Sequence, residues 1–392
     1  MFAERLEYIL KHNTVAQKFY RIFFSFVFKV LGLFIKVNPK QVIISSLIGK
    51  NYGDSMKVLY DEMRKNPKFE GYTYVWAFDD PAKYKVDGDA KKVKLVSPSY
   101  YIEALRSGIW LSNVSIERGL HFKPKKTIYL NTWHAMAINY VGNALNGRKD
   151  YDFSDVGFMC CGCDYEAEVF IRDFLVRKEA LVKCGMPRND WLYNITDEDK
   201  IEMRKRIGLP LDKRIIFVAP TWRDSPDGGK TYPLDFPIDW KLWEENLSDE
   251  YIILFRKHHI TTDVIGLEFN EFVRDMSSYP NINDLYVVSD ILISDFSSTL
   301  MDFSILERPI ISFAYDFDEY SKGRGFYRTL EELFNNCVYY DQKSLLNHIL
   351  TFDWNEECEK ARVVKATYMK GNGGHATEAC IKYLEEHIID NK

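Results

Sequence analysis

Short apolar runs alternate with helix-patterned segments along the chain from residue 42 onward. VIISS (42–46) and YTYVWAF (72–78) have the length and the β-branched or aromatic content of buried strands. Between them, DSMKVLYDEMRK (54–65) has apolar residues at helical spacing, with Asp54 or Ser55 in position to cap a helix. The same alternation predicts further strands at 92–96, 109–113, 126–133, 156–161, 179–185, 214–222, 251–258 and 309–315. It predicts further helices at 97–108, 164–177, 197–209, 241–247, 297–308 and 377–388, and a short helix followed by a strand within 284–294.

This alternation predicts an α/β fold with parallel, doubly wound sheets, and it restarts near residue 197. A chain of 392 residues is long enough for two domains of ordinary size. We therefore expect two Rossmann-like domains that face a central cleft, an N-terminal domain at 39–190 and a C-terminal domain at 191–392. The last helix can pack back on the N-terminal domain. Ligands of doubly wound sheets bind beyond the carboxyl ends of the strands, so the functional site is expected there.

The first 38 residues form a separate segment with an amphipathic pattern. FYRIFFSFVFKVLGLFIKV (19–37) is strongly apolar, but Arg21, Lys29 and Lys36 interrupt it, which makes it a poor membrane-spanning helix. These cations are seven or eight positions apart and fall close to one helical face. An apolar surface with a basic stripe is typical of an interfacial helix, and the alternative is a helix packed in the protein's own core. The segment 1–38 is thus predicted to associate with a membrane.

The charge of the chain is unevenly distributed. Residues 1–40 hold seven Lys or Arg against two Glu and net +5, so the remaining residues carry −10 for a total of −5. A basic end on an acidic body argues against general nucleic-acid binding. It fits attraction of that end to anionic lipid headgroups.

The cysteines indicate a reducing compartment. There are seven, an odd number, which is typical of free thiols in a cytoplasmic protein. Cys160, Cys161 and Cys163 are clustered, but Cys184 is the only other cysteine within reach in sequence, so a zinc site has less support than a buried strand edge and turn. With the N-terminal segment, this predicts a peripheral, monotopic protein on the cytoplasmic face of the cell membrane.

Six short motifs stand at or near the ends of predicted strands and helices. In chain order they are NTWHAMAIN (131–139), GMPRND (185–190), APTWRD (219–224), FRKHH (255–259), SDILISDFSSTLMDFSILERPI (289–310) and KGRGFY (322–327). Together they resemble the CDP-glycerol glycerophosphotransferase family of teichoic acid and capsule assembly. The family's usual forms include QTWHGTPLK, GxPRND, APTWRD, RxH and TDYSSxxFDFxxLxRP followed by RGFY. Any one motif is weak, whereas six in this order make the chain from about Val42 to its C-terminus similar to the family.

The resemblance implies a GT-B-like fold in which the N-terminal half takes the acceptor and the C-terminal half takes the CDP-polyol. The implied reaction is attack of an acceptor hydroxyl on the β-phosphorus of the donor, with CMP leaving. The implied partners are a CDP-glycerol or CDP-ribitol donor, a lipid-linked glycan or polymer acceptor and an anionic membrane surface, without nucleic acid. A GT-B glycosyltransferase that uses a nucleotide sugar and a catalytically silent membrane scaffold remain as alternatives.

His134 is the candidate catalytic base. It follows the strand predicted at 126–133, and the TWH motif of the family has its catalytic histidine at this position. An imidazole has a pKa near neutrality, so it can accept a hydroxyl proton without extreme tuning. Without the resemblance, a hydrogen-bonded structural histidine would be the more common interpretation. Asp302 or another carboxylate can orient the ring.

Cations and hydrogen-bond donors are expected to hold the pyrophosphate while negative charge moves onto CMP. Ser297 and Ser298 precede a predicted helix, where hydroxyls and the first amides form an anion site. Asp302, one turn into that helix, can bind polyol hydroxyls. Each candidate also has a plainer interpretation as a helix cap, a surface charge or a loop salt bridge. The other phosphate-binding candidates lie in the matched motifs and are Thr221, Arg223, Arg256, His258 and Arg324.

Two positions beside His134 depart from the family's pattern. Ala135 replaces a glycine, and Asn139 stands where a lysine is usual. Loss of that cation can change how an acceptor phosphate is held, so the identity of the acceptor stays open. Asp316 and Asp318 have the spacing of a metal-binding pair, but the family carries a similar pair without needing metal there. Neither a metal nor another cofactor is expected.

Overall fold

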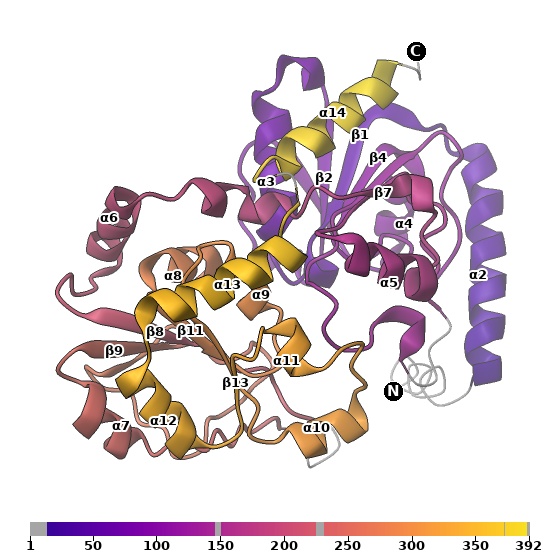
Figure 1. The fold of residues 1–392 in the computed structure, drawn as a ribbon. Coiled ribbons are helices and arrows are strands. Elements are labelled where there is room, and N and C mark those ends of the chain that lie inside the picture. Colours follow the sequence, from indigo (N-terminus) through magenta and orange to yellow (C-terminus); the bar gives the residue numbers. More distant parts are fainter. Residues whose placement is uncertain (1–13, 146–149, 225–230, 372, 390–392) are drawn as a thin grey trace. The chain divides into compact units, whose positions relative to one another are not determined.

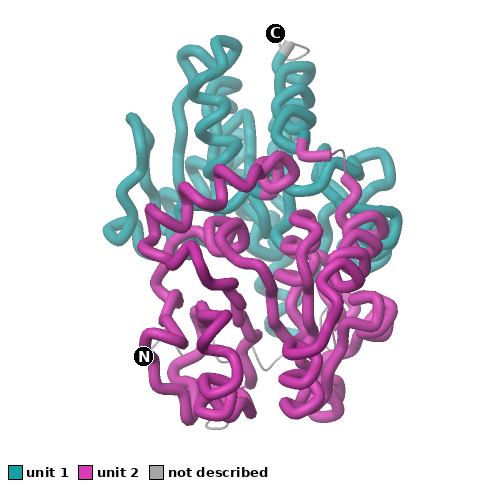
Figure 2. Tube along the Cα trace, turned by 60° about the vertical axis from the view of Figure 1, so that its left-hand side comes forward, with its two compact units in different colours: residues 1–134, 147–188, 375–392 teal, residues 135–146, 189–374 magenta. Residues whose placement is uncertain are grey.

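The computed structural model describes residues 14–145, 150–224, 231–371 and 373–389. Residues 1–13 of the predicted membrane segment, which include Arg5 and Lys11, lie outside the described residues. The chain divides into two compact units (Figure 2). Unit 1 comprises Met1–His134, Gly147–Arg188 and His375–Lys392, and unit 2 comprises Ala135–Asn146 and Asn189–Gly374.

Unit 1 is built on a seven-stranded sheet in which the paired strands run parallel (Figure 1). The order across the sheet is β3-β2-β1-β4-β5-β6-β7. The chain thus begins in the middle, builds one side and returns to build the other, which places a topological switch point between β1 and β4. The strands are β1 (Asn38–Ser45), β2 (Thr73–Phe78), β3 (Ala90–Lys94), β4 (Ser107–Ser112), β5 (Ile128–Asn131), β6 (Phe158–Cys160) and β7 (Leu181–Val182).

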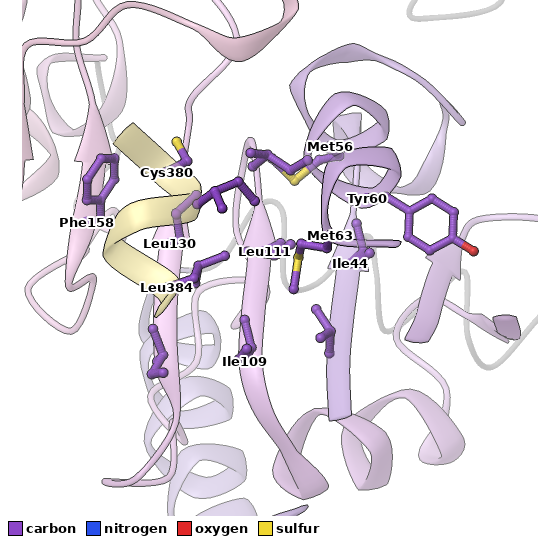
Figure 3. Packing of buried hydrophobic residues seen from close by; sticks show 14 of the residues in the cluster. Ile44, Met56, Tyr60, Met63, Ile109, Leu111, Leu130, Phe158, Cys380 and Leu384 are labelled. Atoms are coloured by element: carbon purple, nitrogen blue, oxygen red, sulfur yellow. The ribbon is translucent and has the colours of Figure 1, made fainter. Parts of the chain in front are cut away.

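Helices from both ends of the chain pack in unit 1. The last helix packs against α3, β5 and β6, and Figure 3 shows its Cys380 and Leu384 beside Leu130 and Phe158 in the buried cluster. The cluster is predominantly apolar, so its burial is the main stabilising contribution to this face of the sheet. The helices are α2 (Thr14–Phe34), α3 (Asp54–Lys65), α4 (Pro98–Arg106), α5 (Asp164–Phe174) and α14 (Ala376–Ile389), with 3₁₀ turns η1 (Leu47–Gly49), η2 (Pro67–Phe69), η3 (Pro81–Lys83) and η5 (Lys178–Ala180).

Unit 2 repeats the same plan with a six-stranded parallel sheet of order β10-β9-β8-β11-β12-β13. Its switch point lies between β8 and β11. The strands are β8 (Arg214–Val218), β9 (Tyr251–Phe255), β10 (Val273–Asp275), β11 (Ile291–Ser294), β12 (Ile310–Phe313) and β13 (Val338–Tyr339). The helices are α6 (Asp197–Ile207), α7 (Trp240–Leu247), α8 (Ile282–Val288), α9 (Thr299–Ser304), α10 (Phe317–Gly323), α11 (Leu330–Leu333), α12 (Gln342–Thr351) and α13 (Trp354–Tyr368), with 3₁₀ turns at η4 (Gly142–Ala144) and, beginning in unit 1, at η6 (Pro187–Asn194).

The predicted α/β fold with parallel sheets is confirmed, while several elements are shorter than expected, two of them at the candidate site. The strand predicted at 126–133 ends at Asn131, because Trp133 adopts a left-handed backbone conformation with φ of 52°. The helix predicted at 297–308 covers only Thr299–Ser304, and Glu307 is left-handed with φ of 57°. Apolar periodicity cannot report such turns, because the buried side chains continue through them.

Helix α2 packs along unit 1 with one face only (Figure 1). On that face Phe28 stacks on Tyr101 at a centroid distance of 4.1 Å, and the hydroxyl of Ser25 accepts the backbone N–H of His121 at 3.0 Å. Arg21, one of the predicted basic stripe, pairs with Asp150 at 2.9 Å. The opposite face leaves large apolar side chains exposed, namely Val15, Phe19, Ile22, Phe23, Phe26, Val30, Leu33 and Phe34. None of the helices in the described ranges has the length and apolar character needed to cross a bilayer.

Candidate active site

His134 lies three residues beyond β5, at the carboxyl edge of the sheet of unit 1. Its Nδ1 is 2.7 Å from the backbone carbonyl oxygen of Asn113. A carbonyl can only accept, so Nδ1 carries the proton and Nε2 keeps its lone pair. Burial lowers the pKa of His134 below its ordinary value of 6.5, although the Asn113 carbonyl acts in the opposite direction. The ring is therefore neutral at pH 7 and presents Nε2 as a proton acceptor.

The backbone immediately before His134 is held in a strained turn. A left-handed conformation is unfavourable for a bulky residue such as Trp133 and persists only where the surroundings impose it. Trp133 is 5% exposed, and its ring packs edge-on against Phe174 at a centroid distance of 4.6 Å. The backbone N–H of Trp133 donates to Oδ1 of Asn131 at 2.8 Å. These contacts fix the direction in which the chain presents the imidazole.

A buried ion pair lies beside His134. Nη1 of Arg188 donates to Oδ2 of Asp54 at 2.8 Å and to the backbone carbonyl of His134 at 2.7 Å. The two charged side chains are only 10% and 11% exposed. Burial alone would raise the pKa of Asp54, but Arg188, the N–H of Ser55 and the amide of Asn113 outweigh it and lower the pKa. Both charges are therefore present at neutral pH. The main role of Arg188 in these contacts is to hold the structure of the site.

Asn113, the residue after β4, connects these groups. It is fully buried. Its Nδ2 donates to Oδ1 of Asp54 at 3.0 Å, its Oδ1 accepts the N–H of Leu47 at 2.7 Å, and its carbonyl accepts from His134. One residue at the switch point of the sheet thus sets the position of both the base and the neighbouring carboxylate. The partner of the imidazole Nδ1 is this carbonyl and not a carboxylate.

In unit 2, the carboxylate of Asp295 fixes the loop that follows β8. Asp295 follows β11 and is fully buried. It accepts the N–H of Thr221 at 3.0 Å and its hydroxyl at 2.8 Å, and it pairs with Nη1 of Arg223 at 2.8 Å. Arg223 also donates to both oxygens of Asp316, at 2.6 and 2.9 Å. Two carboxylates thus neutralise Arg223, so its guanidinium supports the loop and has no unpaired charge to offer.

Arg324 is the more available cation of this region. Its guanidinium carbon lies 4.4 Å from the ring centroid of Trp222, which is a cation–π distance. Its Nη2 is 3.2 Å from the carboxylate of Asp224, whose side chain is 76% exposed. An ion pair with so exposed a partner is weak, because water screens it. Arg324 can therefore exchange this carboxylate for a phosphate without losing its stacking on Trp222.

His258 lies on the same tryptophan, with ring centroids 6.4 Å apart. The N–H of Ile260 donates to its Nδ1 at 3.3 Å, so the proton of the neutral ring resides on Nε2. Burial and the neighbouring His259 lower the pKa of His258 to about 4. At neutral pH, His258 is a neutral hydrogen-bond donor, which suits a phosphate oxygen but adds no positive charge. Trp222 therefore brings together two of the predicted phosphate-binding residues.

Arg256, the first basic residue of the FRKHH motif, is engaged with backbone. Its Nη1 donates to the carbonyl of Met276 at 3.2 Å and to that of Tyr279. Burial lowers the pKa of its guanidinium below the ordinary value. Arg256 therefore holds the 276–279 loop beside β9. Its partners in these two hydrogen bonds are backbone carbonyls and not carboxylates.

Ser297, Ser298 and Asp302 do not act simply as caps of helix α9. Ser298 makes no side-chain cap hydrogen bond, and the hydroxyl of Ser297 accepts the N–H of Thr299 at 3.3 Å. Both serines are partly exposed, whereas Asp302 is only 4% exposed. Oδ1 of Asp302 accepts Nδ2 of Asn189 at 2.7 Å. The hydroxyl of Ser298 can meet a ligand, while Asp302 is tied to the GMPRND motif inside unit 2.

A pocket of about 450 Å³ opens beside Arg223 and Arg324. Its walls combine carboxylates and tyrosines with these two guanidinium groups. Carboxylates accept hydrogen bonds from polyol hydroxyls, and guanidinium groups bind phosphates. The remaining lining residues are Asp224, Pro233, Asp235, Pro237, Tyr315, Asp316, Glu319, Tyr320 and Gly323.

The residues that follow His134 belong to unit 2. Asn139 forms an isolated antiparallel bridge with Phe326 of the RGFY motif. Its Nδ2 donates to the hydroxyl of Tyr320 at 3.2 Å. The position that departs from the family's lysine is therefore a neutral hydrogen-bonding residue packed on the loop that carries Arg324.

Several residues of these clusters were not among the predicted site residues. Asp54 was interpreted only as a helix start, Asn113 only as a strand end, and Arg188, Trp222 and Asp295 only as parts of motifs. Trp222 and Asp295 could have been found from the sequence, because each stands inside a matched motif at the end of a strand. Asp54 and Asn113 carry no such signal, since their partners lie far away in sequence.

The cysteines are all free and buried, and Cys160 lies in β6 with its sulfur 3.6 Å from that of Cys380. Within the described ranges, no group of three or more His, Cys, Asp or Glu side chains is arranged to hold a metal ion. Asp316 of the predicted DxD pair is bound by Arg223.

The buried pair of Asp54 and Arg188 leads to a prediction about stability. Replacing Arg188→Met removes one partner and leaves a buried carboxylate, which should lower the free energy of unfolding by about 3–5 kcal/mol. The double variant Asp54→Asn, Arg188→Met should recover part of this loss, because no lone charge is then buried. Chemical denaturation of both variants, with the exposed Lys382→Met as control, measures the effect. Additive losses in the double variant would contradict the prediction.

Comparison with known proteins identifies a family model and several relatives to which this chain is similar. The family model described as CDP-glycerol:poly(glycerophosphate) glycerophosphotransferase matches residues 26–386. A teichoic acid poly(glycerol phosphate) polymerase of Staphylococcus epidermidis is 33% identical over 335 residues, which cover 81% of this chain and 46% of the relative. A teichoic acid glycerol-phosphate transferase of Staphylococcus aureus is 28% identical over 364 residues, covering 87% of this chain and 92% of the relative.

A solved structure is also similar to this chain over most of its length. A variant of the wall teichoic acid polymerase TagF soaked with CDPG has a TM-score of 0.80 and 29% identity, with 93% of each chain covered. This chain spans less than half the length of the S. epidermidis polymerase. The family model nevertheless covers nearly all of the described structure, from within α2 to α14. The chain belongs to the CDP-glycerol:poly(glycerophosphate) glycerophosphotransferase family.

Proposed function

We propose that this chain transfers a glycerol phosphate, or a related polyol phosphate, from a CDP-activated donor to a hydroxyl group of a membrane-linked glycan or polymer, with release of CMP. Family membership and the teichoic acid enzymes among its relatives support this proposal. The observation that carries it is the state of His134. The imidazole is neutral, its Nδ1–H is bound by the Asn113 carbonyl, and its Nε2 is left as a base.

The reaction requires one proton acceptor and one displaced group. The acceptor hydroxyl oxygen forms a bond to the β-phosphorus of the donor, while Nε2 of His134 takes the hydroxyl proton. The bond between that phosphorus and the bridging oxygen breaks, and this oxygen leaves as part of CMP. The Asn113 carbonyl keeps its hydrogen bond to Nδ1–H throughout, and it stabilises the imidazolium that forms.

Unit 2 supplies the residues for the donor in this proposal. Arg324 neutralises the pyrophosphate, Nε2–H of His258 donates to a phosphate oxygen, and the Ser298 hydroxyl adds a further donor. Thr221, Arg223 and Asp302 hold the loops from which these groups act. The pocket with its carboxylates and tyrosines next to Arg324 fits the hydroxyl groups of the polyol.

The finer architecture belongs to the same proposal. We assign acceptor binding to the N-terminal domain (39–190) and donor binding to the C-terminal domain (191–392), in a GT-B-like arrangement with a cleft between them. Two features support this assignment. Each sheet has the doubly wound order, whose ligands bind beyond the carboxyl ends of the strands. His134 is also the last residue of unit 1 before the chain enters unit 2.

Helix α2 attaches the protein to the cytoplasmic face of the membrane in this proposal. Its inner face is packed on unit 1, and its outer face exposes a continuous apolar stripe in which Phe19, Phe26 and Leu33 are 65% exposed or more. Lys29 and Lys36 are exposed as well and can contact anionic headgroups. A monomeric soluble protein rarely leaves so large an apolar surface uncovered.

Removing the imidazole tests the proposed chemistry. His134→Ala should lower the rate of CMP release from CDP-glycerol by at least about 100-fold, the usual contribution of a general base. His375→Ala, which removes a largely exposed histidine, is the matched control and should keep the wild-type rate. Wild-type and variant proteins are assayed, in the presence of native lipid acceptor, for release of CMP from CDP-glycerol and CDP-ribitol and for release of UDP from UDP-sugars. Unchanged release by His134→Ala would exclude it as the base, and release from UDP-sugars alone would exclude the polyol-phosphate reaction.

The pH dependence gives a second test. The base is active when deprotonated, and burial lowers the pKa of His134 below 6.5. The rate constant kcat/KM should therefore be constant around pH 7 and should fall on the acidic side of pH 6.5 as His134 becomes protonated. His258, with its pKa lowered to about 4, stays neutral through this range. A limb with its midpoint above pH 6.5 would contradict the assignment.

The outer face of α2 can be tested separately from the chemistry. Phe26→Asp together with Leu33→Asp should release the protein from the membrane fraction, because each carboxylate would have to enter the apolar layer. Leu211→Asp, at an exposed leucine of unit 2, is the control and should leave the distribution unchanged. Flotation with lipid vesicles gives the measurement, and retention of the double variant in the membrane fraction would refute attachment through α2.

A further inference from the structure

A small pocket opens at the edge of the sheet of unit 1 that is opposite to His134. It has a volume of about 210 Å³. Pro39 lies at the start of β1, Gly108 at the start of β4, and Ile128 is the first residue of β5. His134 follows the other end of β5. Ligands that react in doubly wound folds bind at the carboxyl ends of the strands, so a pocket at the amino ends does not belong to the catalytic site.

The backbone at this edge of the sheet is irregular. The pairing of β1 with β4 shifts in register between Asn38 and Val42, which is the signature of a bulge. A Cβ atom on Gly108 would lie 2.6 Å from the Cα of Pro39, so the two strands approach more closely than a side chain would allow. Gly108 therefore lines the pocket with backbone alone.

The walls of this pocket are apolar, while its charged lining is entirely basic. Val37, Pro39, Tyr72, Ile128 and Ile388 form the apolar part. The charged residues are Lys36 and Lys126, both exposed. Within the described part of the chain neither of them has an ion-pair partner. A pocket of this composition favours a ligand that combines an anionic group with a short apolar part.

The pocket adjoins the C-terminal end of α2. Lys36 and Val37 come directly after this helix, whose final residues Leu33 and Phe34 are each 81% exposed. The uncovered apolar face of α2 thus leads along the chain to the pocket. If α2 lies in the headgroup region of a bilayer, the pocket lies within reach of a lipid that remains in that bilayer.

We propose that this pocket binds one anionic phospholipid molecule. The lipid phosphodiester lies between Lys36 and Lys126, and the first part of an acyl chain contacts Val37, Ile128 and Ile388. The inference rests on the proposed membrane attachment and adds to it a defined lipid-binding site. A free inorganic phosphate would leave the apolar walls uncovered, and a zwitterionic lipid would bring a second cation close to Lys36 and Lys126, so charge and shape favour the anionic lipid.

A water-soluble lipid separates this pocket from general adhesion to a bilayer. Dihexanoyl phosphatidylglycerol below its micellar concentration is titrated into the full chain by calorimetry. One molecule should bind per chain, dihexanoyl phosphatidylcholine should bind at least about fivefold more weakly because it brings no net charge for a lysine, and glycerol 3-phosphate should not bind. Equal affinity for all three ligands, or the absence of saturable binding, would overturn the proposal.

Matched variants locate the site. Lys126→Gln should weaken binding of dihexanoyl phosphatidylglycerol about fivefold, the usual contribution of one lysine to an anionic lipid. Lys125→Gln makes the same charge change at the preceding residue. Lys125 is exposed and does not line the pocket, so this variant should leave the affinity unchanged. Ile388→Trp should fill the hollow and abolish binding without changing any charge. Equal effects of Lys126→Gln and Lys125→Gln would show that the lipid binds elsewhere.

Vesicles distinguish the failure of this site from the failure of membrane attachment. Wild-type protein should float with vesicles of phosphatidylglycerol and phosphatidylcholine, and Ile388→Trp should float less. If the wild-type protein does not float at all, membrane attachment itself is refuted and the lipid site with it. If the wild-type protein and Ile388→Trp float equally, only the lipid site is refuted. CMP release by Ile388→Trp in detergent should match the wild type, because the pocket is remote from His134.

Discussion

The ion pair between Asp54 and Arg188 holds four separate parts of unit 1 in one arrangement. Asp54 stands at the start of α3, and Arg188 follows β7. Through the amide of Asn113 the same carboxylate reaches the end of β4, and through the carbonyl of His134 the same guanidinium reaches the loop after β5. A buried pair is costly unless its hydrogen bonds are complete. The position of the imidazole therefore depends on a buried charge pair that contacts its backbone carbonyl.

Under the proposed function unit 2 has a different electrostatic requirement, because it would have to attract a pyrophosphate while its own charges stay paired. Arg223 is held by Asp295 and Asp316 and contributes rigidity. Arg324 is held by aromatic contacts with Trp222 and Tyr320 and by an exposed carboxylate. The cation that is free to meet a ligand is thus the one with the weaker partners, while the strongly paired one shapes the loop. His258 adds direction to this site and no charge.

The sequence predicts the layers of this fold and the strand ends where the candidate site residues lie, because both follow from the length and period of apolar runs. It does not predict which polar residues meet. Asp54 and Arg188 are 134 positions apart, and Arg223 and Asp316 are 93 positions apart. Strands β10 and β13, with three and two residues, are too short for any periodic signal. Helices α12 and α13 did have readable lengths, but their mixed polarity conceals the buried face, as in α13 with Glu357 and Cys358 buried side by side.

Helix α14 has a consequence for the order in which the chain matures. It contributes Cys380, Ile381 and Leu384 to the core of unit 1, yet it follows unit 2 in the sequence. All of unit 2, up to Gly374, is synthesised before it. Nascent domains usually fold in order from the amino end. Here unit 1 cannot complete its core until α14 has been translated, so its apolar face stays uncovered until unit 2 has been made.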